Sequence, residues 1–276
     1  MCVDRLPLDS DRYLDIMQAS RIPILSFFKE ALKEDKRLLL PRALDTSIKT
    51  ALRIPRSLFM SDGPRRELYV FKTLDRWAKK VCSLFQMRLQ VVGPSRLSSD
   101  GTYLFVANHQ SPADIVALYA ALPVQAGFVA TSLMAQIPIF SYWMHQSGAV
   151  FVEQGDRRGE MRAFRTMVER LKRGRSLILF PEGYMHQGSG LAEFNRGGIH
   201  SALIARVPIV PVYIGGTAEV LPSGSLKIEP RKNVVVEFGD PIEVGHLARE
   251  EREKVDARLR ERIAAMKASW TESRSA

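Results

Sequence analysis

His109 and Asp114 are the side chains whose types and spacing best suit catalysis, because only four residues separate an imidazole from a carboxylate. Residues 103–107 form an apolar, β-favouring run, and Ser111 with Pro112 is typical of a helix start. His109 should therefore lie at the end of a strand and Asp114 in the first turn of a helix, where the helix dipole keeps its carboxylate ionised. There Asp114 can accept the imidazole Nδ1–H and leave Nε2 free as a general base.

This pair predicts deprotonation of an incoming alcohol, because no serine or cysteine in the turn stands out as a nucleophile. A positioned general base contributes roughly 10²–10⁴-fold in rate. Taken alone the spacing is a weak signal, since a histidine in a turn that merely hydrogen-bonds to a neighbouring helix-capping residue gives the same pattern. Three blocks further along the chain bear on that choice.

These blocks are Phe180-Pro-Glu-Gly183, Phe194-Asn-Arg-Gly197 and Val207-Pro-Ile-Val-Pro-Val212, in that order. Together with Asn108-His-Gln-Ser-Pro-Ala-Asp114 they resemble the glycerolipid acyltransferase family, whose bacterial lysophosphatidate acyltransferases carry NHxxxxD, FPEGTRS and VPIVPV-like blocks. The resemblance covers about residues 65–240. It implies catalysis by His109 and Asp114, with Asn108, Glu182 and Gly183 among the substrate-binding residues, the glycine letting the backbone approach ligand oxygens.

The sequence departs from the family at two places where an arginine is expected to bind a phosphate: after the Phe180-Pro-Glu-Gly183 block, and after an expected strand that precedes it. The residues after Gly183 are Tyr184-Met185-His186 instead of Thr-Arg-Ser, and the strand Phe151-Val-Glu153 is followed by Gln154 instead of arginine. Neither Gln nor Met can reproduce the planar, two-pronged hydrogen bonding of a guanidinium. Two explanations stay open: a nearby arginine takes over the phosphate, or the acceptor headgroup is not a simple phosphate monoester. The candidate arginines are Arg157, Arg158 and Arg196.

Arg196 and Gly197 also precede an expected helix, whose N-terminus would favour a phosphate or an oxyanion. The alternative is a tight connection with a solvated arginine. Pro208 and Pro211 lie in the last block, and we expect both, together with Phe151, to shape the acyl pocket.

The resemblance implies direct transfer of a fatty acyl group from acyl-CoA or acyl carrier protein to a hydroxyl of a lyso-glycerophospholipid. The first candidate acceptor is 1-acylglycerol-3-phosphate, and no cofactor or metal is expected. Two other hypotheses are a lipid-binding protein on a decayed acyltransferase fold, motivated by the missing arginines, and an esterase that activates water with the same dyad. The sequence has no GxSxG, GxxxxGK[ST] or HExxH pattern, which argues against a serine hydrolase, a P-loop nucleotidase and a zinc protease.

The elements that must position these residues are those of an α/β protein with a mixed, mostly parallel sheet flanked by helices. Short β-rich runs alternate with helical stretches from residue 88 onward. We expect strands at residues 89–92, 103–107, 126–130, 149–153, 176–180, 209–214 and 234–238. We expect helices at residues 112–121, 133–145, 158–173, 198–205 and 247–269.

The residues before this domain predict a helical, basic region. Residues 36–88 carry 13 basic and 4 acidic side chains, a net charge of +9 in a chain whose total is +10. Residues 65–85 have apolar side chains at helical spacing with Lys72, Arg76, Lys79 and Lys80 elsewhere on the wheel, and residues 11–60 predict two or three shorter helices. The domain boundaries are thus 1–87 for a membrane-associating helical region and 88–276 for the acyltransferase domain.

A basic amphipathic helix of this kind suits a solvated helix packed on the core, a membrane-surface element or both, and no nucleic-acid signature supports a third role. We expect peripheral attachment to an anionic membrane on its cytoplasmic face. Residues 115–152 lack Asp, Glu, Lys and Arg, but prolines, a glycine and glutamines interrupt them, which argues against a spanning helix. Within that stretch we expect residues 133–144 to be part of a buried core, or else to line an acyl groove or face lipid. Cys2 and Cys82 are too few for a disulfide framework, and the first residues do not read as a signal peptide.

Overall fold

The computed structural model of the protein describes residues 39–93, 97–136, 138–186, 190–225 and 227–275. A seven-stranded sheet forms its centre, in the order β1-β7-β6-β2-β5-β3-β4. The strands are β1 (Arg88–Val92), β2 (Leu104–Ala107), β3 (Ala126–Thr131), β4 (Val150–Val152), β5 (Ser176–Leu179), β6 (Ile209–Gly215) and β7 (Asn233–Phe238). The expected fold class is confirmed, and each expected strand matches one of these seven with its ends shifted by at most two residues.

Five neighbouring strands, from β6 to β4, run parallel to one another. Strand β7 is antiparallel to β6, and β1 is parallel to β7. The central strands β2, β5 and β6 are mostly apolar and buried along their whole length, as expected of strands covered on both faces. The carboxyl ends of β2 and β5 therefore meet at one edge of the sheet, and in open parallel sheets this edge is where ligands bind.

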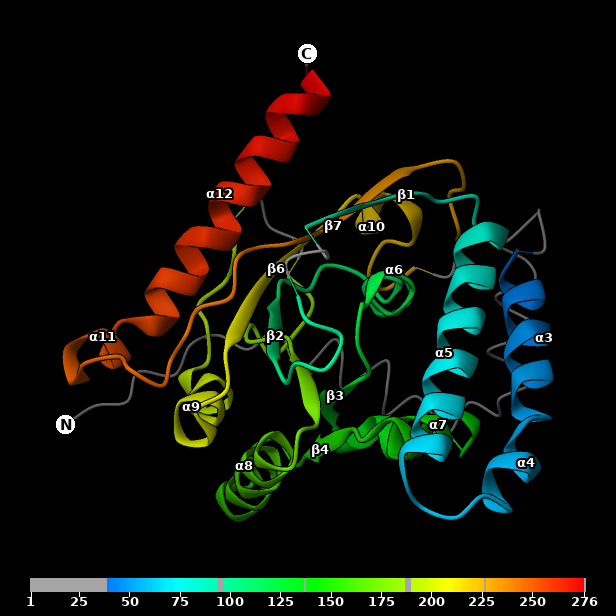
Figure 1. Ribbon diagram of the computed structural model, residues 1–276. Coiled ribbons are helices and arrows are strands. Elements are labelled where there is room, and N and C mark those ends of the chain that lie inside the picture. The colour runs from blue at the N-terminus through cyan, green and yellow to red at the C-terminus, as the bar shows by residue number, and fades with distance from the viewer. Residues whose placement is uncertain (1–38, 94–96, 137, 187–189, 226, 276) are drawn as a thin grey trace.

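Helices cover both faces of the sheet (Figure 1). On one face lie α3 (Leu39–Ala51), α4 (Ile54–Leu58), α5 (Pro64–Leu84), α6 (Ala113–Ala121) and α7 (Pro138–Ser147). On the other lie α8 (Arg157–Lys172), α9 (Arg196–Ala205), α11 (Arg249–Glu253) and α12 (Val255–Ser275). Each face has its own cluster of buried side chains, and both clusters use alternate residues of the same strands.

The helical region that precedes β1 shares its core with the sheet. The basic amphipathic helix expected at residues 65–85 is present as α5, and it buries Val70, Leu74, Ala78 and Val81. Those side chains belong to the same cluster as α6, and the Cys82 Sγ lies 4.0 Å from the carbonyl oxygen of Val116. The boundary at residue 87 therefore divides the helical region from the α/β region, but the two regions share one hydrophobic core. Of the shorter helices expected in residues 11–60, α3 and α4 lie within the described residues and the rest of that range lies outside them.

Two expectations about helices need correction, and one helix was not expected. The helix expected at 133–145 is a 3-10 turn, η3 (Ser132–Gln136), followed by α7, which begins at a proline. The helix expected at 247–269 is divided into α11 and α12, and α12 continues to Ser275. A four-residue helix, α10 (Thr217–Val220), was not expected, because a single turn is too short to show helical periodicity.

Candidate active site

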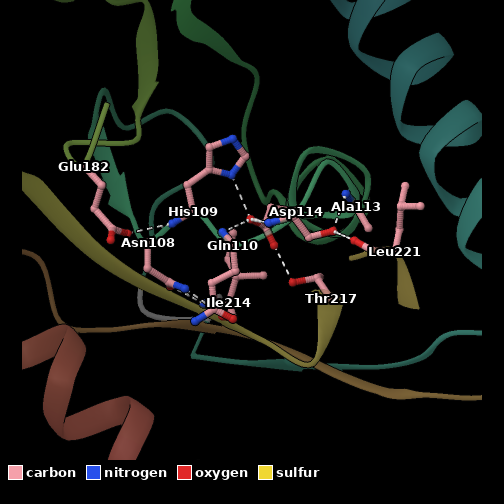
Figure 2. Close-up of polar contacts among 10 residues, drawn as sticks. Asn108, His109, Gln110, Ala113, Asp114, Glu182, Ile214, Thr217 and Leu221 are labelled. Carbon is pink, nitrogen blue, oxygen red and sulfur yellow. Dashed lines mark hydrogen bonds and ion pairs between the residues drawn. The ribbon is translucent and has the colours of Figure 1, made fainter. Parts of the chain in front are cut away.

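The turn between β2 and α6 brings His109 and Asp114 together as their spacing predicts. The His109 Nδ1 lies 2.8 Å from the Asp114 Oδ2, and the Asp114 side chain is completely buried, whereas 15% of the His109 side chain is exposed. Ser111 caps the start of α6, since its Oγ accepts the amide N–H of Ala113 at 3.0 Å. In Figure 2 the second ring nitrogen of His109 points away from Asp114, so Nε2 is the atom left to meet a substrate.

The Asp114 carboxylate is held by backbone N–H groups of the turn that precedes it. Its Oδ2 accepts the backbone N–H groups of Gln110 at 2.7 Å and Ser111 at 2.9 Å, in addition to the imidazole. These donors stabilise a carboxylate anion, because each places a partial positive charge on the oxygen. A carboxylate held in this way fixes the imidazole tautomer with the proton on Nδ1.

The segment that follows β6 supports the same turn from behind. The Asn108 side chain is fully buried and pairs with the backbone of Ile214, donating to its carbonyl at 2.9 Å and accepting its N–H at 2.8 Å. The Ser111 hydroxyl donates to the carbonyl of Leu221 at 2.6 Å, and the Thr217 hydroxyl donates to Asp114 Oδ1. Asn108 was expected to bind substrate, but its side-chain amide is bonded to β6 and holds the end of β2 against that strand.

Glu182 lies at the carboxyl end of β5, in the loop where the sequence placed it, and its side chain is buried. Its Oε1 accepts the backbone N–H of His109 at 2.9 Å, and its Oε2 accepts that of Ala192 at 2.9 Å. The backbone carbonyl of His109 in turn accepts the N–H of His186 at 2.8 Å. The carboxylate therefore links the catalytic turn to the chain that follows β5, a function that the sequence did not reveal.

One face of the imidazole lies against an aromatic ring. His109 stacks on Phe180 with ring centroids 4.1 Å apart, and Phe180 stacks on Phe128 at 5.8 Å. Phe151, expected in the acyl pocket, is half-buried on the same face of the sheet, where its ring contacts that of His145 at 4.7 Å. The apolar side chains beside the dyad therefore continue toward β4 and α7.

The two prolines of the expected acyl pocket do not lie beside the dyad. Pro208 precedes β6, and its carbonyl accepts the N–H of Leu104, so it stands at the opposite end of the parallel strands from His109. Pro211 pairs in register with Val106 in the middle of the sheet and packs near Gly239 and Met266, on the face that α12 covers. Neither proline therefore lies beside Phe180 and His109.

The residues expected to meet the acceptor lie at the rim of the same sheet edge. Gly183 adopts a φ of 74°, and its carbonyl accepts a hydrogen bond from the Gln154 side chain at 3.3 Å. Arg157 and Arg158 are exposed in the first turn of α8 and line a surface depression with Asp156 and Met161. The amides of Arg158 and Gly159 hold the pKa of the Asp156 carboxyl below its usual range.

Arg196 is already engaged by another helix. It is the first residue of α9, and its guanidinium donates to Asp256 Oδ2 at 2.7 Å and to the carbonyl of Glu253 at 2.7 Å. The hydrogen bond from Arg196 holds the pKa of Asp256 below its usual range. Gly197 donates its N–H to the helix cap Asn195. In this arrangement the Nε and Nη2 groups of Arg196 and the backbone N–H of Gly197 are already bonded within the protein, so they are not available to a phosphate.

Taken together, the geometry offers a base with a free Nε2, a buried carboxylate that orients it, and an apolar surface beside it. Among the described residues, no three His, Cys, Asp or Glu side chains gather as ligands for a metal ion. Thr217 is the functional residue that the sequence analysis missed, since no local pattern links it to a turn that lies 103 positions earlier.

Comparisons with known proteins find similarity to acyltransferases. Residues 88–215 match the family model described as Acyltransferase. The 1-acyl-sn-glycerol-3-phosphate acyltransferase of Escherichia coli K12 is 27% identical over 209 residues, which cover 74% of this chain and 82% of that protein. The chloroplastic 1-acyl-sn-glycerol-3-phosphate acyltransferase LPAT1 of Arabidopsis thaliana is 33% identical over 145 residues, which cover 52% of this chain and 40% of that protein.

The same fold is found in a solved structure. The crystal structure of the 1-acyl-sn-glycerophosphate (LPA) acyltransferase PlsC from Thermotoga maritima superposes with a TM-score of 0.67 at 24% identity, over 82% of this chain and 97% of that one. Residues 88–215, which match the acyltransferase family model, contain all four of the sequence blocks, so this part of the chain is similar to that family.

Proposed function

We propose that the protein is an O-acyltransferase that moves a fatty acyl group from an acyl thioester to a hydroxyl of a lyso-glycerophospholipid. The observation that carries the proposal is the His109–Asp114 pair, 2.8 Å apart, with Nε2 directed away from the buried carboxylate. The names of the relatives from Escherichia coli and Arabidopsis thaliana support 1-acylglycerol-3-phosphate as the first candidate acceptor. The donor is acyl-CoA or acyl carrier protein.

The proposed reaction is a direct transfer. Nε2 of His109 accepts the proton of the acceptor hydroxyl as its oxygen attacks the thioester carbonyl. The resulting tetrahedral oxyanion collapses, the C–S bond breaks, and the thiolate takes the proton back from the imidazolium, so the enzyme returns to its starting state. Asp114 stabilises the transient imidazolium and keeps it oriented, in the same way that a buried aspartate supports other histidine bases.

The half-buried apolar side chains beside the dyad support a path for the acyl chain. Phe180 contacts His109 directly, and the cross-strand pair Ala130 and Phe151 lies farther along the same face of the sheet. Such a surface favours an alkyl chain by about 25 cal/mol for each Å² of apolar area removed from water. The partly buried residues of this surface are Phe180, Ala130, Phe151, Met134, Phe140 and Tyr142.

A second candidate is an acyltransferase whose lyso-lipid acceptor lacks a terminal phosphate. Three observations favour it: Gln154 stands where the family carries an arginine and bonds to Gly183, Met185 stands where it carries another, and Arg196 is held by Asp256. Only Arg157 and Arg158 then remain, of the arginines considered, as exposed guanidinium groups beside this rim.

Incubation with radiolabelled acyl-CoA and a panel of lyso-lipids tests these proposals together. The panel contains lysophosphatidate, lysophosphatidylethanolamine, lysophosphatidylglycerol and a phosphate-free lyso-lipid, with His109→Ala as the inactive control. Newly acylated lysophosphatidate supports the first candidate, and acylation confined to another member supports the second. Release of free fatty acid would indicate an esterase, and no product from any acceptor would indicate a lipid-binding protein.

We also propose that the protein attaches to an anionic membrane surface on the cytoplasmic side through its N-terminal helices. The apolar face of α5 is used inside the protein, but large apolar side chains remain exposed around α3, α4 and the start of α5. Exposed basic side chains on α5 would add roughly 1 kcal/mol of attraction each near anionic headgroups. The exposed apolar residues are Ile48, Leu52, Leu58, Phe59 and Leu68, with Phe59 at 91% exposure.

Within the described residues no helix is both long and apolar enough to span a bilayer. Vesicle co-sedimentation tests the attachment. Reversing Lys72, Arg76, Lys79 and Lys80 to Glu should release the protein from anionic vesicles at physiological salt while leaving activity on detergent-dispersed substrate. The matched control reverses four exposed basic residues elsewhere: Arg165, Lys172, Arg173 and Arg258. Equal binding by the wild type and the α5 variant would rule out α5 as the charged contact.

A further inference from the structure

Three side chains of the catalytic turn are bonded to one short segment that lies more than a hundred positions later. This segment, residues 214–221, comprises the end of β6, a glycine turn and α10. Figure 2 shows it lying behind the turn, on the side away from the free edge of the imidazole. The contacts are Asn108 with Ile214, Asp114 with Thr217, and Ser111 with Leu221.

The contact with Asp114 differs from the other two because it reaches the catalytic carboxylate itself. Asp114 Oδ2 receives three N–H groups, which come from its own turn and from His109. Among the described residues, Oδ1 receives only the hydroxyl of Thr217. Both side chains are completely shielded from solvent, so no bulk water can replace this donor.

The backbone immediately before Thr217 is fixed by a glycine. Gly216 adopts a φ of 81°, and a Cβ on it would come within 2.0 Å of the carbonyl oxygen of Asn233 in β7. Only glycine fits this close approach without displacing β7. The turn therefore fixes where α10 begins, and Thr217 is the first residue of that helix.

We propose that Thr217 is a positioning residue, which holds the Asp114 carboxylate in the rotation that directs Oδ2 at His109 Nδ1. The torsion of a carboxylate about its Cβ–Cγ bond has broad minima, so one anchored oxygen leaves freedom that a second anchor removes. Loss of the hydroxyl would leave Oδ1 buried without a donor, and the carboxylate would turn to share the remaining N–H groups. His109 would then lose the partner that keeps its proton on Nδ1. The kinetic consequence rests on the proposed acyltransferase function.

Kinetics of Thr217→Val provide the first test, because valine keeps the shape and deletes only the hydroxyl. We expect kcat to fall about tenfold or more, as for other lost hydrogen bonds to a charged group, with the KM values of both substrates within twofold of wild type. Thr217→Ser, which restores the hydroxyl, should recover kcat to within about threefold. The matched control is Thr73→Val, since Thr73 is also a buried threonine and its hydroxyl, among the residues that the structure describes, donates only to the carbonyl of Tyr69 in its own helix.

A kcat for Thr217→Val equal to that of Thr73→Val would overturn the proposal. So would failure of Thr217→Ser to restore activity, because the loss would then come from packing. The second test needs no turnover: ¹⁵N NMR of His109 above neutral pH should report the Nδ1–H tautomer in wild type and in Thr73→Val, and a mixture of tautomers in Thr217→Val. An unchanged tautomer in Thr217→Val would overturn the proposal as well.

The two tests keep the inference separate from the function on which it rests. If wild type transfers no acyl group to any acceptor, the proposed function fails, while the tautomer of His109 still decides the role of Thr217. If wild type is active and Thr217→Val behaves like wild type in both tests, only the role of Thr217 fails.

Discussion

The base and the acceptor rim lie at the same edge of the sheet, yet they are built in opposite ways. Around the base, Asp114, Asn108 and Thr217 are completely buried, and each has its polar atoms bonded to named partners. At the rim, Gln154, Arg157 and Arg158 are exposed, and the Gln154 side chain makes one long hydrogen bond of 3.3 Å. On the proposed function, this arrangement pairs a rigid centre for proton transfer with a loosely held surface for acceptor recognition.

This difference has a physical reason. Proton transfer requires Nε2 to be placed within a few tenths of an ångström, and only side chains that are packed and fully bonded can hold such a position. Headgroup binding by exposed side chains tolerates rearrangement, because long side chains reach a ligand from several rotamers. Substitutions at the centre should therefore change kcat, and substitutions at the rim should change KM and the choice of acceptor.

The largest effect should follow removal of the base. His109→Ala should lower kcat by about 100-fold or more while leaving acyl-CoA binding largely intact, because it deletes the proton acceptor and little else. Steady-state kinetics and equilibrium binding of acyl-CoA measure the two quantities. His200→Ala, at an exposed histidine of α9, is the control. Retention of more than about a tenth of the wild-type kcat, or a trapped acylated side chain, would refute direct transfer by this base.

A smaller loss should follow Glu182→Gln. Both carboxylate oxygens accept backbone N–H groups, so the NH₂ of glutamine must face the amide of either His109 or Ala192. One buried donor is then left without an acceptor, which costs about 1–3 kcal/mol of stability and lets the catalytic turn move. We expect a lower Tm and a kcat reduced about tenfold. Glu193→Gln, at an exposed neighbour, should leave both unchanged, and equal behaviour of the two variants would show that Glu182 does not hold the turn.

At the rim, Gln154→Arg should alter acceptor preference without altering the base. An arginine at this position beside Gly183 can bind a phosphate monoester through two hydrogen bonds, which together contribute about 1.5–3 kcal/mol. We expect the KM for lysophosphatidate to fall about tenfold relative to that for a phosphate-free acceptor, with kcat within twofold. Gln154→Met serves as the control for loss of the glutamine. A parallel change for all acceptors would mean that residue 154 does not face the headgroup.

The smallest effect concerns the pair that holds Arg196. Because the folded-state pKa of Asp256 is lowered, its contribution to stability is present at neutral pH and is lost as the pH falls through and below the ordinary carboxyl range. Asp256→Asn should therefore destabilise the protein at pH 7 by no more than about 1 kcal/mol, since the arginine is largely exposed. Thermal unfolding at pH 7 and near pH 3 checks this, and an equal loss at both values would exclude the ion pair as the cause.

The same variant tests whether Arg196 can serve the acceptor. Freed from Asp256, the guanidinium becomes available at the start of α9, and a lower KM for lysophosphatidate in Asp256→Asn would identify it as the missing phosphate ligand. An unchanged KM would leave Arg157 and Arg158 as the remaining arginines for that role, with Arg157→Ala and Arg158→Ala as the next variants.

The sequence predicted the parts of this site whose signals are local. His109 and Asp114 lie on one short turn, and the strand and helix on either side of it follow from apolar runs and from Ser111 with Pro112. The break before α7 could also have been predicted, because a proline inside a helical pattern marks a helix start.

The remaining contacts could not be predicted, because they join segments that are distant in the chain. Nothing near Thr217 indicates a carboxylate partner 103 positions earlier, and α10 is too short to show a periodic pattern. Glu182 was recognisable as a loop carboxylate, but which amides it accepts depends on how β2 and β5 lie side by side. The position of Pro211 was misjudged because alternation along β6 places it on the face opposite Phe180.

The partners in these contacts are far apart in the sequence, which affects the order in which the contacts can form while the chain is being synthesised. Asn108, Ser111 and Asp114 find these partners 106, 110 and 103 positions later, so a chain that ends before β6 has β2 and α6 but lacks these three contacts of their turn. Contacts of such separation form late, because the intervening chain must first be ordered. A nascent chain can thus fold α5 against α6 before these contacts form, and on the proposed function we expect activity only after residues 214–221 have left the ribosome.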